Sequence, residues 1–312
     1  MKQQQAAQKL RGATGFEAYY SALYGERWQA IKAAFSAEPA YVAYYAGGKP
    51  NNAVSTPAAS AGAQDAEIAA SATASTAATA TADRTCEPYF LDAGSVRAAV
   101  SLPLAGAEHI LDMCAAPGGK TLVLASCMGG DATLLSNERS AERRIRLSRV
   151  CDASLPPATR ARVTISGNDG ATMCLKQSAC FDRILLDAPC SSERHVLSDS
   201  RYLAEWSPAR IKTLAMTQWA LLSSAWRMLT SGSYLLYSTC ALAREENDGV
   251  ITRLLKKFAD AETLPAAVAS DASAFCAAAL PEGEPTEHGT IILPDVAGGA
   301  GPLYFCLLRK LC

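Results

Sequence analysis

Residues 109–121 read HILDMCAAPGGKT, an apolar run that leads directly into a turn of small residues with two glycines. The apolar run predicts a short buried strand over residues 109–113, and the residues after the turn predict a helix over about 120–128. Glycines between a strand and a helix let the backbone approach a ligand closely, and the start of the helix then points free N–H groups at it. The segment therefore predicts a binding turn for a nucleotide phosphate or for the carboxylate of an amino-acid-like ligand.

The alternation of strand and helix continues toward the carboxyl terminus. Short apolar runs predict four further strands, at residues 132–136, 162–166, 183–187 and 234–238. The run at 183–187 is continuous and ends in an acid, which is typical of a strand that is buried on both faces of a parallel sheet. Amphipathic stretches predict helices at residues 140–151 and 245–258, and a third that starts at Ser207 and Pro208, which suit the N-cap and the first helical position.

Two more apolar segments, at residues 290–293 and 303–309, are joined by a glycine-rich loop and predict an antiparallel hairpin. The chain therefore predicts an α/β fold with a doubly wound, mostly parallel seven-stranded sheet that ends in this hairpin. In such sheets ligands bind at the carboxyl ends of the strands, where the strand order reverses.

The amino-terminal part has a different character. Residues 14–45 carry an apolar stripe with helical spacing, which predicts a small helical element that packs on the main domain. Residues 53–82 consist almost entirely of Ala, Ser and Thr, which predicts a disordered linker, although the alanines also suit transient helix. The expected organisation is a helical element at 1–52, a linker at 53–84 and a catalytic domain at 85–312.

The composition limits the classes of protein to which the chain can belong. The 312 residues are 49% hydrophobic, enough for a full α/β core, and no apolar run approaches the roughly 20 residues that span a bilayer. The start lacks the apolar core of a secretory signal, and the eleven cysteines form no C-x-x-C pair, which together predict a cytoplasmic protein without a zinc site or other metal. The net charge of −1 argues mildly against a nucleic-acid substrate, so any RNA affinity must come from a local patch or a partner.

The glycine turn has a competing interpretation as a nucleoside-triphosphate-binding loop, because Gly119, Lys120 and Thr121 match the end of that motif. The motif also requires a glycine five residues before Gly119, and Cys114 occupies that position, so this interpretation is disfavoured. Glu138 follows the second strand and suits the ribose hydroxyls of a nucleotide-like ligand. Asp169 follows the third strand and is placed to meet an adenine edge, although alone it is an ordinary turn residue.

Two cysteines and one acid follow neighbouring predicted strands. Asp187 and Cys190 lie in DAPCSS after the fourth strand, and Cys240 lies in STC after the fifth. These are the groups that methylation of cytosine at carbon-5 requires: a thiolate that adds to carbon-6 and a carboxyl that stabilises the intermediate at ring N3. The residues alone do not say which cysteine attacks and which assists release. The alternative for each cysteine taken alone is an inert buried residue, which is the more common role of a lone cysteine.

The motifs DMCAAPGGKT, DAPCSS and YSTCAL, the last followed by Glu246 and Asn247, resemble the Nop/Sun (NSUN) family of RNA cytosine-5 methyltransferases over residues 89–309. The resemblance implies a class I S-adenosylmethionine-dependent methyltransferase with a Rossmann-like sheet. It also implies that Cys240 is the nucleophile and that Cys190 assists product release. Within the family, the segments YGERW, YFLDAGS and GPLYFC resemble the mitochondrial ribosomal RNA member, which works with a helper protein.

By the same resemblance, one set of residues would contact S-adenosylmethionine. Its members are Cys114, Ala115, Ala116, Pro117, Gly118, Gly119, Lys120, Glu138, Arg143, Asp169 and Asp187. Glu138 departs from the family pattern, in which Asp is usual at that position; the charge is kept and the reach is longer.

The expected substrate is ribosomal RNA, and transfer RNA is the main alternative because it shares the chemistry. A third reading is an inactive RNA-binding or assembly module on a methyltransferase fold. The presence of Cys190, Cys240 and Asp187 together argues against it, because a binding module has no need of all three.

Overall fold

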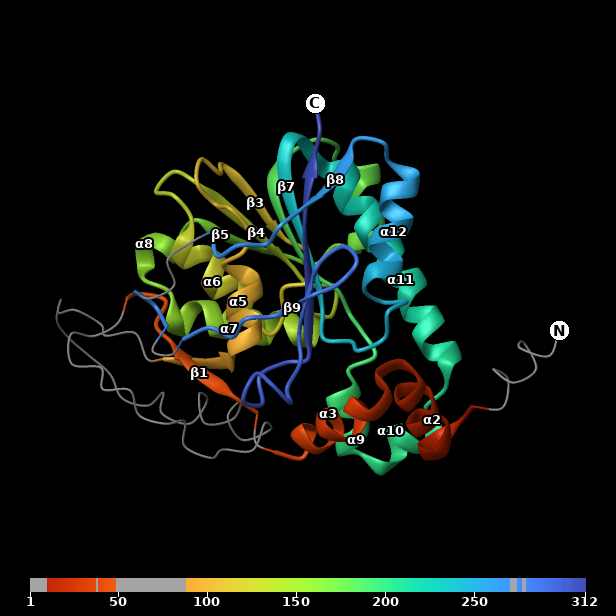
Figure 1. Ribbon diagram of the computed structural model, residues 1–312. Helices are drawn as coiled ribbons and strands as arrows, with labels where there is room; N and C mark the ends of the chain where they lie inside the picture. Colours follow the sequence, from red (N-terminus) through yellow and green to blue (C-terminus); the bar gives the residue numbers. More distant parts are fainter. Residues whose placement is uncertain (1–9, 38, 49–87, 270–273, 277–278) are drawn as a thin grey trace.

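The computed structural model describes residues 10–37, 39–48, 88–269, 274–276 and 279–312. Within these residues a nine-stranded sheet forms the centre of the molecule, with the strand order β5-β4-β3-β6-β7-β11-β10-β9 and with β8 paired to β11 (Figure 1). Its parallel half consists of β3 (His109–Asp112), β4 (Thr133–Asn137), β5 (Val163–Ser166), β6 (Phe181–Asp187) and β7 (Leu229–Thr239). The five parallel strands predicted from sequence are therefore confirmed.

The carboxyl-terminal edge of the sheet is antiparallel. β11 (Leu303–Lys310) pairs antiparallel with β7, and β10 (Thr290–Ile292) pairs antiparallel with β11, which confirms the predicted hairpin. Two short strands, β8 (Ala261–Leu264) and β9 (Glu284–Pro285), extend the predicted seven strands to nine. They were not predicted because β9 has only two residues and β8 is only partly buried, so neither strand shows an alternation of apolar and polar residues.

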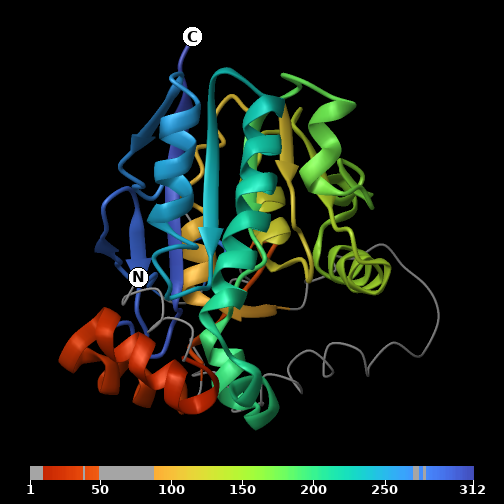
Figure 2. The same ribbon diagram turned by 90° about the vertical axis from the view of Figure 1, so that its right-hand side faces the viewer.

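Helices cover both faces of the sheet. One face carries α5 (Ala93–Ala99), α6 (Gly119–Cys127), α7 (Ala141–Ser154) and α8 (Pro157–Arg160), and the other carries α11 (Pro208–Met228) and α12 (Asp248–Lys257), which lie in front of the strands in Figure 2. Successive residues of a strand point to opposite faces, so Ile110 and Leu185 join one core cluster while Leu111 and Leu186 join the other. The parallel strands are thus buried on both sides.

The amino-terminal helical prediction is correct for the first part of the segment only. α2 (Gly12–Tyr24), the short 3-10 helix η1 (Gly25–Arg27) and α3 (Trp28–Phe35) are helical, but β1 (Tyr41–Tyr44) is a strand that pairs antiparallel with β2 (Tyr89–Asp92). Pro39 disfavours a helix that continues through it, and the alternating burial of residues 41–44 suits a strand. The predicted linker at 53–84 lies outside the described residues.

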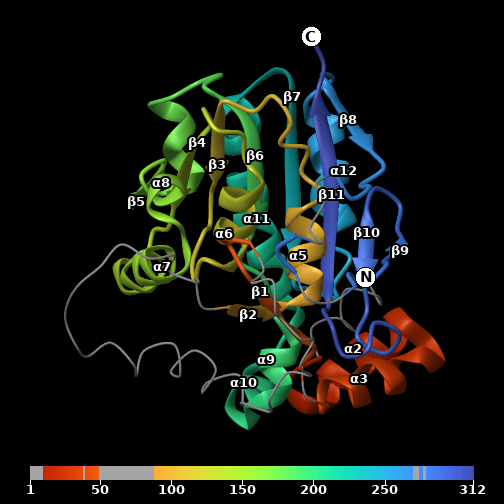
Figure 3. The same ribbon diagram turned by 90° about the vertical axis from the view of Figure 1, so that its left-hand side faces the viewer.

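Two further short helices, α9 (Glu193–Ser198) and α10 (Ser200–Glu205), follow β6 and pack beside α2 and α3 at one end of the molecule (Figure 3). The arrowhead of β7 points toward this group of helices in Figure 2, so the group lies at the carboxyl ends of the parallel strands. The aromatic stripe of α2 and α3 meets Trp206 there, with ring centroids 5.4 Å apart for Phe16 and Trp206. Among the described residues, no helix is both long and apolar enough to cross a membrane.

Candidate active site

The predicted site residues gather at the carboxyl ends of β3, β4, β6 and β7. The loop 114–118 joins β3 to α6, Glu138 follows β4, Asp187 ends β6 and Cys240 follows β7. Asp187 and Ser238 are register partners across β6 and β7, so these two strands end at the same level. The common direction of the parallel strands therefore brings residues that are far apart in sequence to one edge of the sheet.

Asp187 is held by one contact at each of its carboxylate oxygens. Lys120 Nζ lies 2.7 Å from Oδ2, and the Ser238 hydroxyl donates to Oδ1 at 2.7 Å. Lys120, in the first turn of α6, also donates to Ser95 Oγ at 3.2 Å. Burial lowers the pKa of Lys120, but the charge and hydrogen bond of Asp187 outweigh it, so the pKa is raised overall. The lysine therefore stays charged and fixes the orientation of a carboxylate whose side chain is 31% exposed.

The two cysteine thiols contact each other. The hydrogen bond between Cys190 and Cys240, together with burial, raises the pKa of Cys190 well above its ordinary value. Cys190 therefore stays protonated and can donate a hydrogen bond to the sulfur of Cys240. Both residues are partly exposed, whereas Cys151, Cys276 and Cys306 are buried.

The glycine loop is braced by neighbouring strands. The Ala115 amide donates to the Asn137 carbonyl at 2.9 Å, and the Arg143 guanidinium donates to the Ala116 carbonyl at 2.6 Å. Arg143 lies in the first turn of α7 and also pairs with Glu138, with Nη1 3.1 Å from Oε2. Arg143 thus links Glu138 to the glycine loop.

Glu138 and Asp169 differ in how much of the side chain is exposed to solvent. The Glu138 side chain is 6% exposed, and its Oε1 accepts from the Ser140 amide at 2.8 Å. Asp169 lies in the loop between β5 and the 3-10 helix η2 (Gly170–Leu175), and its side chain is 41% exposed. Its Oδ1 accepts from the Ala171 amide at 3.2 Å, and its Oδ2 lies 3.6 Å from the Arg139 guanidinium.

Gly118 is required by backbone conformation and packing. Its φ of +125° is rarely adopted by other residues, and an added Cβ would lie 3.0 Å from Val150 Cγ1 and 3.2 Å from Leu147 Cδ1 of α7. We expect Gly118→Ala to lower the free energy of unfolding by about 1–3 kcal/mol in urea denaturation. Gly129→Ala is the control, since Gly129 has no atom within 4 Å of an added Cβ and no positive φ. An unchanged stability for Gly118→Ala would contradict this account.

Sequence reasoning missed several polar residues at the site. Ser95 and Ser238 hold the Lys120–Asp187 pair, and the buried acids Glu193 and Glu246 lie behind the cysteine loops. Asp112, the last residue of β3, is 1% exposed; its Oδ2 accepts from the Thr121 hydroxyl at 2.6 Å and its Oδ1 has no hydrogen-bond partner among the described residues. The strand-end position of Asp112 was the one signal that could have identified it.

The burial of Asp112 makes a testable contribution to the pH dependence of stability. Burial raises the pKa of Asp112 to about 7, so the folded state binds this proton more tightly than the unfolded state, whose pKa is about 3.9. The contribution of Asp112 to the free energy of unfolding is therefore lost as the pH rises from about 4 to about 7. We expect Asp112→Asn to gain stability relative to the parent protein across this interval, measured by urea denaturation at several pH values. A difference that stays constant with pH would contradict the assignment.

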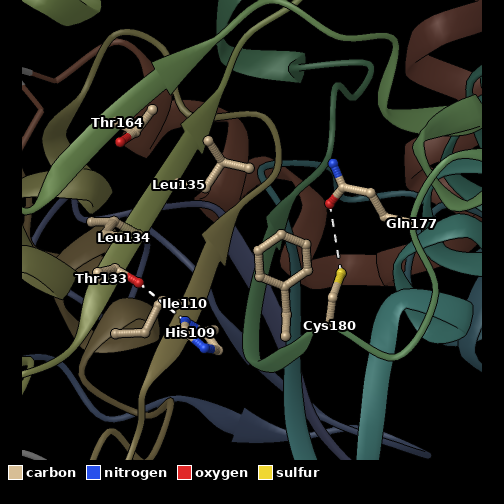
Figure 4. A pocket seen from close by; sticks show the side chains of 9 residues that line it. His109, Ile110, Thr133, Leu134, Leu135, Thr164, Gln177 and Cys180 are labelled. Carbon is tan, nitrogen blue, oxygen red and sulfur yellow. Dashed lines mark hydrogen bonds between the residues drawn. The ribbon is translucent and has the colours of Figure 1, made fainter.

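A cavity of about 350 Å³ lies elsewhere, against the amino-terminal ends of β3, β4 and β6 (Figure 4). Its lining includes His109, Thr133 and Phe181, which begin these strands, and it contains none of the predicted site residues. In the part of the chain that the structure describes, no cluster of three or more His, Cys, Asp or Glu side chains is arranged to hold a metal ion.

Comparison with known proteins finds relatives that are named as RNA methyltransferases. The family model described as 16S rRNA methyltransferase RsmB/F matches residues 99–289. A mitochondrial tRNA (cytosine(34)-C(5))-methyltransferase from Mus musculus is 34% identical over 224 residues, which are 71% of this chain and 63% of that protein. A ribosomal RNA small subunit methyltransferase F from Erwinia tasmaniensis is 36% identical over 184 residues, 58% of this chain and 38% of the relative. The chain thus spans less than two thirds of the length of these two relatives.

Solved structures agree on the fold. A methyltransferase homolog protein from Pyrococcus horikoshii superposes with a TM-score of 0.66 at 25% identity and covers 97% of both chains. The structure of NSun6 from Pyrococcus horikoshii with SFG gives a TM-score of 0.58 at 24% identity, over 72% of this chain and 54% of that one. With more than half of its residues matched by the family model, the chain belongs to the RsmB/F family of methyltransferases.

Proposed function

We propose that this protein transfers a methyl group from S-adenosylmethionine to carbon-5 of a cytosine in RNA. The observation that carries the proposal is the contact of the Cys190 and Cys240 thiols at the ends of neighbouring strands, beside the restrained carboxylate of Asp187. The family to which the chain belongs, described as 16S rRNA methyltransferases, supports the same reaction class.

The residues at the glycine loop fit the proposed cofactor. α6 begins at Gly119 with free N–H groups, which suit a carboxylate, and the unpartnered buried Oδ1 of Asp112 is an acceptor that suits an ammonium group. Glu138 offers the charge for the ribose hydroxyls, and Asp169 lies one strand further along. When bound, S-adenosylmethionine supplies an electrophilic methyl group on a sulfonium centre.

The chemistry assigns one role to each of the three central side chains. The Cys240 thiolate adds to carbon-6 of cytosine, forming an S–C6 bond and moving electron density to carbon-5, which can then accept a methyl group. Asp187 stabilises the intermediate by holding a proton at N3; Lys120 and Ser238 occupy its other lone pairs and fix its direction. A base then takes the carbon-5 proton, the electron pair left at carbon-5 re-forms the C5–C6 double bond, and the S–C6 bond breaks with its electrons returning to the Cys240 sulfur; Cys190 assists this release. The target base must be unstacked to reach the site.

We further propose that the substrate is ribosomal RNA of the small subunit and that the reaction takes place in the cytoplasm. The name of the Erwinia relative favours this substrate, while the mouse relative favours transfer RNA as the second candidate. Residues 85–312 would form the catalytic domain and the amino-terminal helices an attached element. The net charge of −1 suggests that a local basic surface or a helper protein contributes to RNA affinity.

Transfer of labelled methyl groups tests the proposal. The protein is incubated with labelled S-adenosylmethionine and, in separate reactions, naked small-subunit ribosomal RNA, assembled small subunits and transfer RNA, all unmodified. We expect label at carbon-5 of cytosine in one of the ribosomal samples. Label in transfer RNA alone would contradict the proposed substrate and support the proposed reaction. Label on another atom or base would overturn the proposed reaction.

A further inference from the structure

Three tyrosines of α2 reach the loops that carry the two cysteines. The Tyr19 hydroxyl donates to Glu245 Oε2 at 2.7 Å, that of Tyr20 to Glu193 Oε1 at 2.5 Å, and that of Tyr24 to the Leu242 carbonyl at 3.0 Å. Glu193 lies three residues after Cys190, and Leu242 lies two residues after Cys240. The hydroxyls of these three tyrosines thus end on, or directly beside, a segment that follows one of the two cysteines.

Glu193 links these segments to one another. Its Oε1 accepts from both the Tyr20 hydroxyl and the Ser191 hydroxyl, and its Oε2 accepts from the Leu242 amide at 2.9 Å. One carboxyl group therefore joins α2, the loop that follows Cys190 and the loop that follows Cys240. The residue is 0% exposed, so these hydrogen bonds do not compete with water.

A second buried acid supports the same loops from behind. Glu246 Oε2 accepts from the Ser191 amide at 3.0 Å and from Gln218 of α11 at 2.8 Å. The Tyr237 hydroxyl of β7 donates to the Glu246 carbonyl at 2.7 Å. The loop after Cys190 is therefore held on one side by α11 and on the other by Glu193 and α2.

α2 is itself fixed to the body of the molecule, as a positioning element must be. The ring of Tyr20 stacks on Trp28 with centroids 5.1 Å apart, and Trp206 packs against Phe16. Arg27, just after α2, pairs with Glu284 at 2.5 Å and with Asp295 at 2.6 Å. Burial raises the pKa of Tyr20 well above its ordinary value, so its hydroxyl remains a donor at any physiological pH.

We propose that α2 is a positioning element for the reaction, and that Tyr20 acts through Glu193 to set the spacing of Cys190 and Cys240. This inference rests on the proposed function, in which the two sulfurs act at successive steps on one base. A thiol pair that must first attack and then release is sensitive to small displacements, since a misplacement of about 1 Å can cost on the order of 100-fold in rate. The helical element is thus part of the catalytic machinery rather than only a cap.

Tyr20→Phe tests the proposal because it removes the hydroxyl and keeps the ring in the aromatic cluster. We expect kcat to fall about tenfold while KM for S-adenosylmethionine stays unchanged, because Glu193 is not placed at the cofactor loop. Tyr304→Phe is the matched control: its buried hydroxyl donates to the Asp248 carboxylate of α12 at 2.8 Å, and not to the loops that follow the two cysteines. It should lower the melting temperature similarly and change kcat less than twofold.

A second readout separates this inference from the proposed function. The rates of iodoacetamide alkylation at Cys190 and Cys240, followed by peptide mass spectrometry at pH 7, require neither RNA nor cofactor. We expect both rates to change severalfold in Tyr20→Phe and to match the parent protein in Tyr304→Phe. Unchanged alkylation and unchanged kcat in Tyr20→Phe overturn the inference. If Tyr20→Phe alters the alkylation rates but the parent protein methylates no cytosine, the proposed function is overturned and the positioning contact is still supported.

Discussion

Cys240→Ala is expected to abolish methyl transfer to RNA while leaving S-adenosylmethionine binding unchanged. Without the thiolate, carbon-5 of cytosine is too weak a nucleophile, so we expect the rate to fall by at least ~10³-fold. Cys240 follows β7, whereas the glycine loop follows β3 and Glu138 follows β4, so the proposed cofactor contacts of that loop and of Glu138 do not include the cysteine. Incorporation of labelled methyl and equilibrium binding of the cofactor measure the two effects separately.

Cys180→Ala provides the matched control for this loss. Cys180 immediately precedes β6 and is partly exposed, so it lies at the opposite end of the strand from Asp187. Its replacement should leave transfer at the parent rate. Transfer by Cys240→Ala at a rate close to that of the parent would remove Cys240 from the mechanism and direct attention to Cys190 as the nucleophile.

Cys190→Ala should produce the opposite kind of defect, in which the first half of the reaction proceeds and the second stalls. The thiol of Cys190 contacts Cys240 and remains protonated because its pKa is raised, so its loss deprives the departing Cys240 sulfur of a neighbouring proton donor. We expect enzyme to accumulate as a covalent complex with RNA, seen as a slowly migrating band on a denaturing gel.

The double variant Cys190→Ala, Cys240→Ala identifies the atom that forms this complex. It should give no such band, because the attacking sulfur is absent. If Cys190→Ala turns over at the parent rate and traps no RNA, the release role of Cys190 is wrong, and the contact between the two thiols then serves only to position Cys240.

The fold could be predicted because its signals are local. Residues 109–121 contain a strand, a glycine turn and a helix start within one short stretch, and the strand at 183–187 carries a continuous apolar run. The placement of Asp187, Cys190 and Cys240 at one edge follows from strand direction alone. β1 could not be predicted in the same way, because its partner β2 lies far away in the sequence and a short aromatic segment suits helix and strand alike.

The buried acids of the site were missed for a different physical reason. A glutamate in a sequence is expected at the surface, because burying a carboxylate is costly unless hydrogen bonds compensate it. The partners of Glu193 come from Tyr20, Ser191 and Leu242, and the first and last of these are far from it in the chain. The tyrosines of α2 were correctly assigned to an apolar face, but the partners of their hydroxyls depend on the tertiary arrangement alone.

The pairing of β1 with β2 has a consequence for how this chain can vary or be engineered. Tyr44 and Tyr89 are register partners, so the two flanks of the intervening chain are held at facing positions in the folded body. The β1–β2 pairing therefore holds both flanks of the connection whatever its length; for a flexible loop, each doubling of length costs only about 0.6 kcal/mol of closure entropy. A reporter domain or affinity tag inserted between these two anchor points should leave the strand register and the cysteine edge undisturbed, which makes this the natural place to label the enzyme.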